Sequence, residues 1–161
     1  MLNKKINKYL IFILFFISSS LLYAFYIEHA LGYKPCTLCI YERVPYIISI
    51  ILIIEILLFP RYKKITLMLL SIIFIFSAIL AFYHFGIEQG FFSELSFCSA
   101  ENFSNTLSKE QILEKLKENN ISCKNVDFRI VGLSLATINT ILSLVLSVMF
   151  FKLFNIYEKD K

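Results

Sequence analysis

Four long apolar runs dominate the pattern of hydrophobic and polar positions along the chain. They cover residues 9–27, 40–59, 65–85 and 131–151 of the 161 residues. A helix of roughly 20 apolar residues crosses the ~30 Å hydrocarbon layer of a membrane, and open strands with unpaired edges do not span lipid. The pattern therefore predicts an all-α protein. We expect a four-transmembrane-helix bundle that forms a single integral membrane domain over residues 1–161.

Composition agrees with a membrane protein and narrows the choice of partners. The chain is 58% hydrophobic and only 17% charged, whereas soluble domains are about 25% charged, and disordered chains need low hydrophobicity and high charge. The net charge is +4. Its cations lie beside the apolar runs rather than on one basic face, so membrane orientation explains them and no nucleic-acid partner is expected.

The first apolar run raises the question of a cleaved signal peptide, because it follows three lysines. A signal peptide has an apolar core of about 7–15 residues that ends in small residues at the cleavage site. Here the run is longer, and it ends in the bulky sequence Tyr23-Ala24-Phe25-Tyr26. We therefore expect the first run to be retained as a membrane span.

The positions of the cations predict how the spans are oriented. Nine of the 16 lysines and arginines lie near the two termini or in the turn after residue 59, namely Lys4, Lys5, Lys8, Arg61, Lys63, Lys64, Lys152, Lys159 and Lys161. Because cytoplasmic segments are enriched in lysine and arginine, both termini are predicted to be cytoplasmic. Residues 28–39 and 86–130 then form two outer loops. All four cysteines, Cys36, Cys39, Cys98 and Cys123, lie on this outer side.

The second outer loop is long, and it contains a pattern typical of a short helix. Ser108 and Gln111 have the spacing of a capping box, and Ile112, Leu113 and Leu116 then share one helical face. The pattern predicts an amphipathic helix of about ten residues that lies on membrane lipid. A solvated loop helix is the equal alternative.

The fourth apolar run carries small residues at helical spacing. Ala136, Thr140, Ser143 and Ser147 form a stripe, and Asn139 lies beside it. Small residues in such a stripe let neighbouring membrane helices approach closely. We therefore interpret the stripe and Asn139 as packing residues.

The most reactive side chains of the sequence lie at the start of the second apolar run. Cys36 and Cys39 form a C-x-x-C pair, and a helix N-terminus beside them favours a thiolate that exchanges with other disulfides. Arg43 follows four residues later, one turn from Cys39 if the helix has begun. Its cation would stabilise a thiolate or an anionic electron acceptor. Pro45 fits the first turn of a helix, or it introduces a kink.

The chemistry of the cysteines has three possible interpretations. An even number of cysteines facing an oxidising compartment favours disulfides, and exchange between the C-x-x-C pair and the loop cysteines Cys98 and Cys123 would make a redox relay. Two structural disulfides that brace the loops are the first alternative. A zinc site built from all four cysteines is the second, but the spacing matches zinc knuckles poorly, so no metal ligand is predicted. His84 lies at a depth similar to that of Arg43 and could bind a small polar head group.

Several motifs together resemble one bacterial family. The eight residues from Cys36 to Arg43 (CTLCIYER) resemble the C-x-x-C-x-x-E-R motif of the disulfide bond formation protein B (DsbB) family. The Tyr83-His84 pair at the end of the third run and the segments 127–128 and 132–135 also resemble that family. The resemblance extends over nearly the whole chain, although residues 93–97 lack the proline that relatives often carry there.

The resemblance implies a membrane oxidoreductase that generates disulfides. It would reoxidise a DsbA-like thiol oxidase with a thioredoxin fold in the periplasm and pass the electrons to the membrane quinone pool, with ubiquinone or menaquinone as the acceptor. The location would be the bacterial inner membrane, with the cysteines on the periplasmic side. The alternative from the residues alone is a four-span membrane component with structural outer disulfides and no redox turnover.

The same resemblance implies a role for each candidate site residue. The redox-active disulfides would be Cys36–Cys39 and Cys98–Cys123. By the family pattern, the partner's thiolate attacks Cys98, and the released Cys123 passes the reducing equivalents to Cys36. Cys39 then emerges as the thiolate that reduces the quinone. Arg43 and His84 would bind the quinone.

Overall fold

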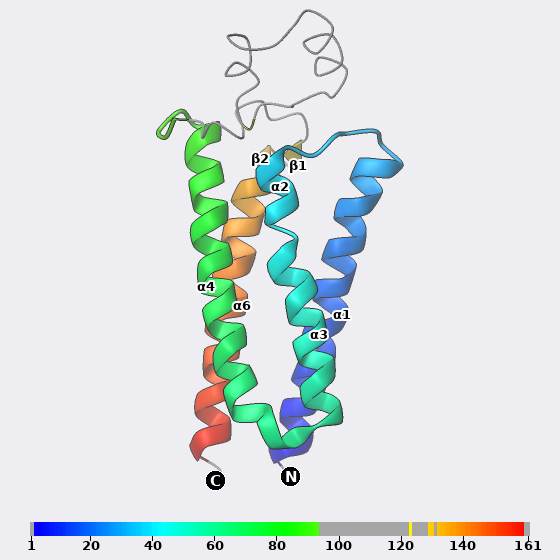
Figure 1. Cartoon of the computed structure of the whole chain (residues 1–161), viewed down its shortest axis with the longest axis vertical. Helices are drawn as coiled ribbons and strands as arrows, with labels where there is room; N and C mark the ends of the chain where they lie inside the picture. Colours follow the sequence, from blue (N-terminus) through cyan, green and yellow to red (C-terminus); the bar gives the residue numbers. More distant parts are fainter. Residues whose placement is uncertain (1, 94–122, 124–128, 131, 160–161) are drawn as a thin grey trace, which may run out of the picture.

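The computed structural model describes residues 2–93, 123, 129–130 and 132–159. Within them, four helical segments are long and apolar enough to cross a membrane, which confirms the predicted all-α, four-span bundle. The segments run side by side, and both chain termini lie at the same end of the bundle (Figure 1). We call the opposite end, which carries Cys36, the cysteine end. Cys98 and the surface helix predicted after Ser108 lie outside the described residues.

The elements follow the chain in a simple order. The bounds are α1 (Leu2–His29), α2 (Thr37–Tyr41), α3 (Val44–Leu58), the 3₁₀ helix η1 (Pro60–Tyr62), α4 (Lys63–Glu88), β1 (Arg129–Ile130), β2 (Leu133–Ser134) and α6 (Leu135–Lys159). β1 and β2 form a small antiparallel hairpin in which Arg129 pairs with Ser134. Gly132 stands in the turn with a φ of 83°, a left-handed conformation that glycine adopts without steric cost.

Several helix bounds differ from the predicted runs. The sequence predicts the fourth span over 131–151, but α6 begins only at Leu135 because the turn and β2 occupy the residues before it. The other end of α6 continues to Lys159, and α4 continues to Glu88. The helices are longer than the apolar runs because helical hydrogen bonding does not stop where the side chains become polar.

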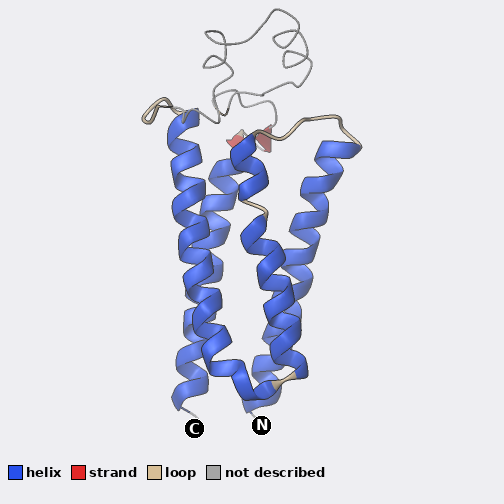
Figure 2. Ribbon diagram, viewed as in Figure 1, coloured by secondary structure: helices blue, strands red, loops and turns tan. Residues whose placement is uncertain are grey.

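The second span is two helices rather than one. α2 ends at Tyr41, and α3 begins at Val44, with a short turn between them (Figure 2). The Arg43 amide donates to the Ile40 carbonyl at 3.1 Å, which tightens the turn. Pro45 lies in the first turn of α3, where its missing N–H costs nothing. The break places the side chains of the turn at the cysteine end.

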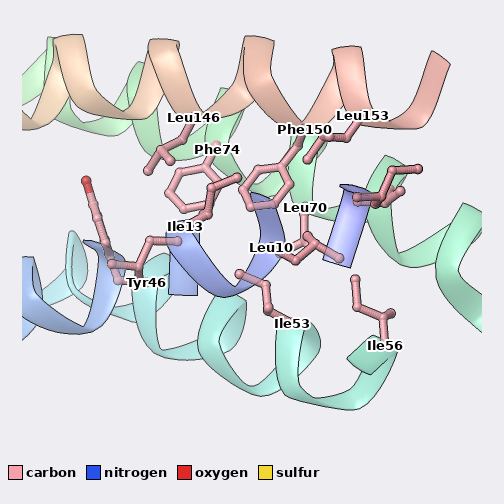
Figure 3. Close-up of a cluster of buried hydrophobic side chains, with 13 residues drawn as sticks. Leu10, Ile13, Tyr46, Ile53, Ile56, Leu70, Phe74, Leu146, Phe150 and Leu153 are labelled. Carbon is pink, nitrogen blue, oxygen red and sulfur yellow. The ribbon is translucent and has the colours of Figure 1, made fainter. Parts of the chain in front are cut away.

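The core of the bundle is aromatic and aliphatic, and all four spans contribute to it (Figure 3). Phe74 of α4 and Phe150 of α6 stack with their ring centroids 5.6 Å apart, and the rings of Phe74 and Tyr46 of α3 form a T-shaped contact. From α1, Leu10 and Ile17 are fully buried in the same cluster. The first apolar run is therefore an integral part of the bundle.

Small polar residues join α4 to α6. Ser71 and Ser147 each donate a hydrogen bond to the other's carbonyl oxygen at 3.2 Å, and the Ser77 and Ser143 hydroxyls are 3.0 Å apart. The buried position of Ser143 and Ser147 confirms that this part of the stripe packs against a neighbouring helix.

The outward face of the bundle is apolar. Phe15, Leu58 and Phe76 are between 66% and 74% exposed, and exposed patches of this kind on a soluble protein are unusual. Together with the four spans, this surface makes the chain a multi-pass membrane protein.

Candidate functional site

A cavity of about 270 Å³ opens at the cysteine end between α1, the α2–α3 turn and α6. Most of its wall is apolar and comes from α1 and α6, including Leu21, Ile27 and Leu142. The polar side chains that line it include Cys36, Cys39, Glu42, Arg43, His84, Glu88 and Asn139. The cavity therefore brings together four of the predicted site residues, Cys36, Cys39, Arg43 and His84, while Cys98 lies outside the described residues.

The start of α2 holds the C-x-x-C pair together. Cys36 is the N-cap of α2, and its sulfur accepts a hydrogen bond from the Cys39 amide at 3.3 Å. The N-cap side chain faces the amide three residues on, so this spacing turns both side chains toward each other. The two sulfurs are 2.9 Å apart. Cys36 is buried and Cys39 is half-buried, so the pair faces the cavity from a fixed position.

Cys123 lies in the same buried cluster as Cys36. It is 2% exposed and packs with Cys36, Leu38 and Ile87. The structure thus brings one cysteine of the long outer loop to the C-x-x-C pair.

His84 connects the sulfurs to a buried carboxylate. Its Nε2 lies 3.5 Å from the Cys36 sulfur, and its Nδ1 lies 2.7 Å from Glu42 Oε1. A carboxylate only accepts hydrogen bonds, so Nδ1 is the nitrogen that donates to Glu42. In the neutral ring, Nε2 then carries the lone pair that faces Cys36.

Glu42 is held by a second helix. Asn139 of α6 donates to Glu42 Oε2 at 2.6 Å, and Tyr46 donates from its hydroxyl to Asn139 Oδ1. Glu42 is only 7% exposed. The sequence predicts Asn139 to be a packing residue, but its amide instead belongs to this polar network. The sequence feature that could have indicated this polar role is an amide side chain inside an apolar run, beside the small-residue stripe.

Glu88 adds a second buried carboxylate, which the sequence pattern did not single out. It lies one turn after His84 on α4, and its Oε1 is 3.8 Å from His84 Nε2. Its side chain is 6% exposed, and Oε2 has no hydrogen-bond partner among the described residues. The sequence feature that could have indicated Glu88 is an acidic residue four positions after a histidine, at the end of an apolar run.

Arg43 lines the cavity but points toward α1. Its guanidinium donates to Glu28 at 2.5 Å and stands 4.9 Å above the centre of the Phe25 ring. The continuous helix that would set Arg43 one turn from Cys39 is interrupted, because α2 ends at Tyr41. The structure therefore anchors the cation to α1 at the cavity wall.

Comparisons with known proteins place the chain in one family. The family model described as disulfide bond formation protein DsbB matches residues 7–153. A protein of Rickettsia prowazekii (strain Madrid E), described as uncharacterized, is 33% identical over 139 residues. That alignment covers 85% of this chain and 80% of the Rickettsia protein. The range matched by the family model includes the four cysteines and every polar residue named on the cavity wall.

Proposed function

Since the chain belongs to the DsbB family of membrane oxidoreductases that generate disulfides, we propose that it couples thiol oxidation in the periplasm to the reduction of a membrane quinone. Its thiol substrate is a DsbA-like dithiol oxidase with a thioredoxin fold. Its location is the bacterial inner membrane, with the cysteine end in the periplasm and both termini in the cytoplasm. The lysines and arginines at the terminal end of the bundle support this orientation.

The observation that carries the proposal is the position of the sulfur pair on the cavity wall. Cys36 and Cys39 face a 270 Å³ cavity whose wall is mostly apolar. A quinone has an apolar ring and tail with two polar oxygens, so apolar walls from α1 and α6 suit the ring. Arg43 and His84 line the same cavity, where the Arg43 guanidinium and, in the protonated ring, His84 Nε2–H would donate hydrogen bonds to the oxygens. When bound, the quinone supplies a two-electron acceptor that leaves as quinol with the two thiol protons.

The electron path runs through two thiol–disulfide exchanges. The partner dithiol reduces a Cys98–Cys123 disulfide, and two electrons and two protons move from the partner to these two sulfurs. Cys123 then attacks Cys36 of the Cys36–Cys39 disulfide, and Cys39 leaves as the free thiolate. Re-closure of the Cys98–Cys123 disulfide releases Cys36 and completes the transfer.

The packing of the sulfurs supports this order of events. Cys123 and Cys36 share one buried cluster, so exchange between them needs no large movement of the bundle. Cys39 is the more exposed sulfur of the C-x-x-C pair, and it lines the cavity that would take the quinone. Cys36 is therefore the sulfur suited to exchange, and Cys39 the sulfur suited to the acceptor.

The reduction potential of the partner determines which electron acceptor the protein needs. Strongly oxidising periplasmic thiol oxidases have a reduction potential of about −120 mV, so their reoxidation requires an acceptor of higher potential. The C-x-x-C disulfide must be restored after every turnover. A lipid-soluble acceptor that reaches the mouth of the bundle meets this need.

Turnover of the purified protein tests the proposal. The full-length chain in detergent is given a reduced thioredoxin-fold oxidase and a short-chain ubiquinone or menaquinone, and quinol formation is followed by absorbance. We expect Cys39→Ser to abolish quinone reduction and Cys98→Ser to block electron entry from the protein partner. Full turnover of either variant would refute the proposed role of that cysteine. If the cysteines never change redox state, the structural-disulfide alternative is favoured.

A further inference from the structure

Three potential metal ligands converge beside the cavity. The sulfurs of Cys36 and Cys39 and a ring nitrogen of His84 all lie within 4.8 Å of one another. Thiolate and imidazole are the ligands that zinc prefers in proteins. Cys36 and His84 are buried, and Cys39 is half-buried, so the group is not a chance cluster on an exposed surface.

Glu88 places a carboxylate beside the same nitrogen. Its Oε1 lies 3.8 Å from His84 Nε2, and the side chain is 6% exposed. Oε2 has no hydrogen-bond partner among the described residues. A buried carboxylate oxygen without a partner is costly, and a cation at this position would satisfy it.

Two of the distances are close to those of a tetrahedral zinc site. With Zn–S near 2.3 Å and Zn–N near 2.05 Å, two such ligands stand about 3.6 Å apart, and the distance from Cys36 Sγ to His84 Nε2 is 3.5 Å. A zinc-bound nitrogen and carboxylate oxygen stand about 3.3 Å apart, against 3.8 Å here for His84 and Glu88. The two sulfurs, at 2.9 Å, must separate to about 3.8 Å, and the Glu88 carboxylate, which is not among the three groups within 4.8 Å of one another, must move toward the sulfurs.

The surroundings of His84 are those of a zinc-binding histidine. A metal-ligating histidine commonly donates a hydrogen bond from its second ring N–H to a carboxylate. This hydrogen bond fixes the ring and directs the other nitrogen to the metal. Here Nδ1 meets Glu42 at 2.7 Å, and Asn139 holds the far oxygen of Glu42 at 2.6 Å. Nε2 is thereby directed at Cys36 and Glu88.

We propose that the reduced protein binds one zinc ion through Cys36, Cys39 and His84, with Glu88 as the fourth ligand. Two thiols lose their protons to the solvent as the ion binds, and no electron moves. Oxidation of the pair to a disulfide removes both thiolate ligands and releases the ion. This ligand set differs from the four-cysteine alternative, because Cys98 and Cys123 take no part in it.

The site has a consequence for turnover, and only this consequence rests on the proposed function. Sulfurs that are bound to zinc are not available to form the Cys36–Cys39 disulfide, so zinc would hold the protein in its reduced form. We expect zinc to inhibit quinone reduction and a chelator to restore it.

A cobalt(II) and zinc titration of the full-length chain tests the site directly. The protein in detergent is reduced, freed of reductant under anaerobic conditions and titrated with Co²⁺, whose thiolate charge-transfer and tetrahedral d–d absorption report the ligands. Zinc is then added to displace the cobalt. We expect one equivalent of each ion to bind, and none to bind after disulfide formation. The Cys98→Ser/Cys123→Ser double variant is the matched control and should bind equally well.

Two further variants test the histidine ligand and the carboxylate that orients it. Glu42→Gln should weaken the affinity by roughly 10- to 100-fold, the usual effect of losing an outer-shell partner of a metal ligand, and His84→Gln should weaken it at least as much. Unchanged affinity in His84→Gln, or loss of binding in the double serine variant, would overturn the ligand set. If metal binding appears while quinone reduction does not, the proposed function fails and the zinc site stands. If quinone reduction appears while metal binding does not, only the zinc site is overturned.

Discussion

At the scale of single residues, Arg43 has a defined place at the junction of three elements. It follows the end of α2, precedes α3 and is tied to α1 through Glu28 at 2.5 Å. Its side chain is 15% exposed, and it lines the cavity with Cys39. This position holds a permanent cation beside the site that we propose for the quinone.

Replacement of Arg43 should raise the apparent KM for the quinone. Loss of a charged hydrogen bond costs about 1.5–3 kcal/mol, so we expect Arg43→Ala to raise the apparent quinone KM roughly tenfold or more. Steady-state quinol formation at varied quinone concentration measures it. Glu28→Gln, which keeps the cation, is the matched variant and should change the KM less. An unchanged quinone dependence in Arg43→Ala would remove Arg43 from the site.

Glu42 is the residue on which the buried polar network depends. It accepts from His84 and from Asn139 through its two oxygens, and a glutamine at this position keeps only one acceptor oxygen. We expect Glu42→Gln to destabilise the protein by about 1–3 kcal/mol, the cost of leaving a buried donor unsatisfied. Thermal unfolding in detergent measures the effect.

The control for Glu42 is an acid on the surface. Glu158 pairs with Lys64, and both side chains are about half exposed. Glu158→Gln should change the stability by about 1 kcal/mol or less, because exposed ion pairs contribute little. Equal effects of the two substitutions would contradict the role given to Glu42.

At the scale of elements, the spans were predictable because lipid imposes a minimum length on apolar helices. The break between α2 and α3 was not, because it depends on how one turn folds rather than on hydrophobicity. Pro45 allowed either a first-turn position or a kink in a longer helix. The structure places it in the first turn of α3, which interrupts the predicted helix between Cys39 and Arg43.

The end of α4 depends on a close approach to Gly86. The chain turns back after Glu88, and the amides of Phe91 and Phe92 both donate to the Gly86 carbonyl. A Cβ atom at Gly86 would stand 2.1 Å from the Phe92 ring, which itself stacks on Tyr83 at 5.4 Å. Glycine at this position leaves room for the ring.

An alanine at Gly86 should displace the Phe92 ring from Tyr83. Loss of such an aromatic pair costs about 0.5–1.5 kcal/mol, so we expect Gly86→Ala to lower stability by this amount, measured as a shift of thermal unfolding. In a Phe92→Ala background the same substitution should cost little, because the obstructing ring is gone. An undiminished cost in that background would show that Phe92 is not the reason for the glycine.

At the scale of the whole molecule, the polar network joins helices that are far apart in the sequence. Glu42 lies 42 positions from His84 and 97 from Asn139. No local pattern reveals such contacts, so the sequence led to the cysteines, Arg43 and His84 through their motif but not to the partners that hold His84. The sequence pattern did not predict Glu88 as a site residue either, because its role depends on the side chains that surround His84 in the folded protein.

The orientation of the molecule can be tested with reporter cysteines in a cysteine-free variant. Leu31 lies between α1 and α2 and is 46% exposed, whereas Tyr62 lies at the opposite end in η1 and is 52% exposed. We expect a membrane-impermeant maleimide to label Leu31→Cys in intact spheroplasts. It should label Tyr62→Cys only after the membrane is opened. The reverse pattern would invert the proposed orientation.

The proposed function depends on direct oxidation of the Cys36–Cys39 pair by a quinone. The most direct measurement uses the Cys98→Ser/Cys123→Ser variant, which keeps only this pair. The variant is reduced, treated with a chelator, given one equivalent of quinone, alkylated, and analysed by mass spectrometry alongside the yield of quinol. We expect one quinol per Cys36–Cys39 disulfide and no alkylation of either sulfur. If both sulfurs remain fully alkylated while the wild-type protein still reduces the quinone, direct oxidation of the pair is contradicted.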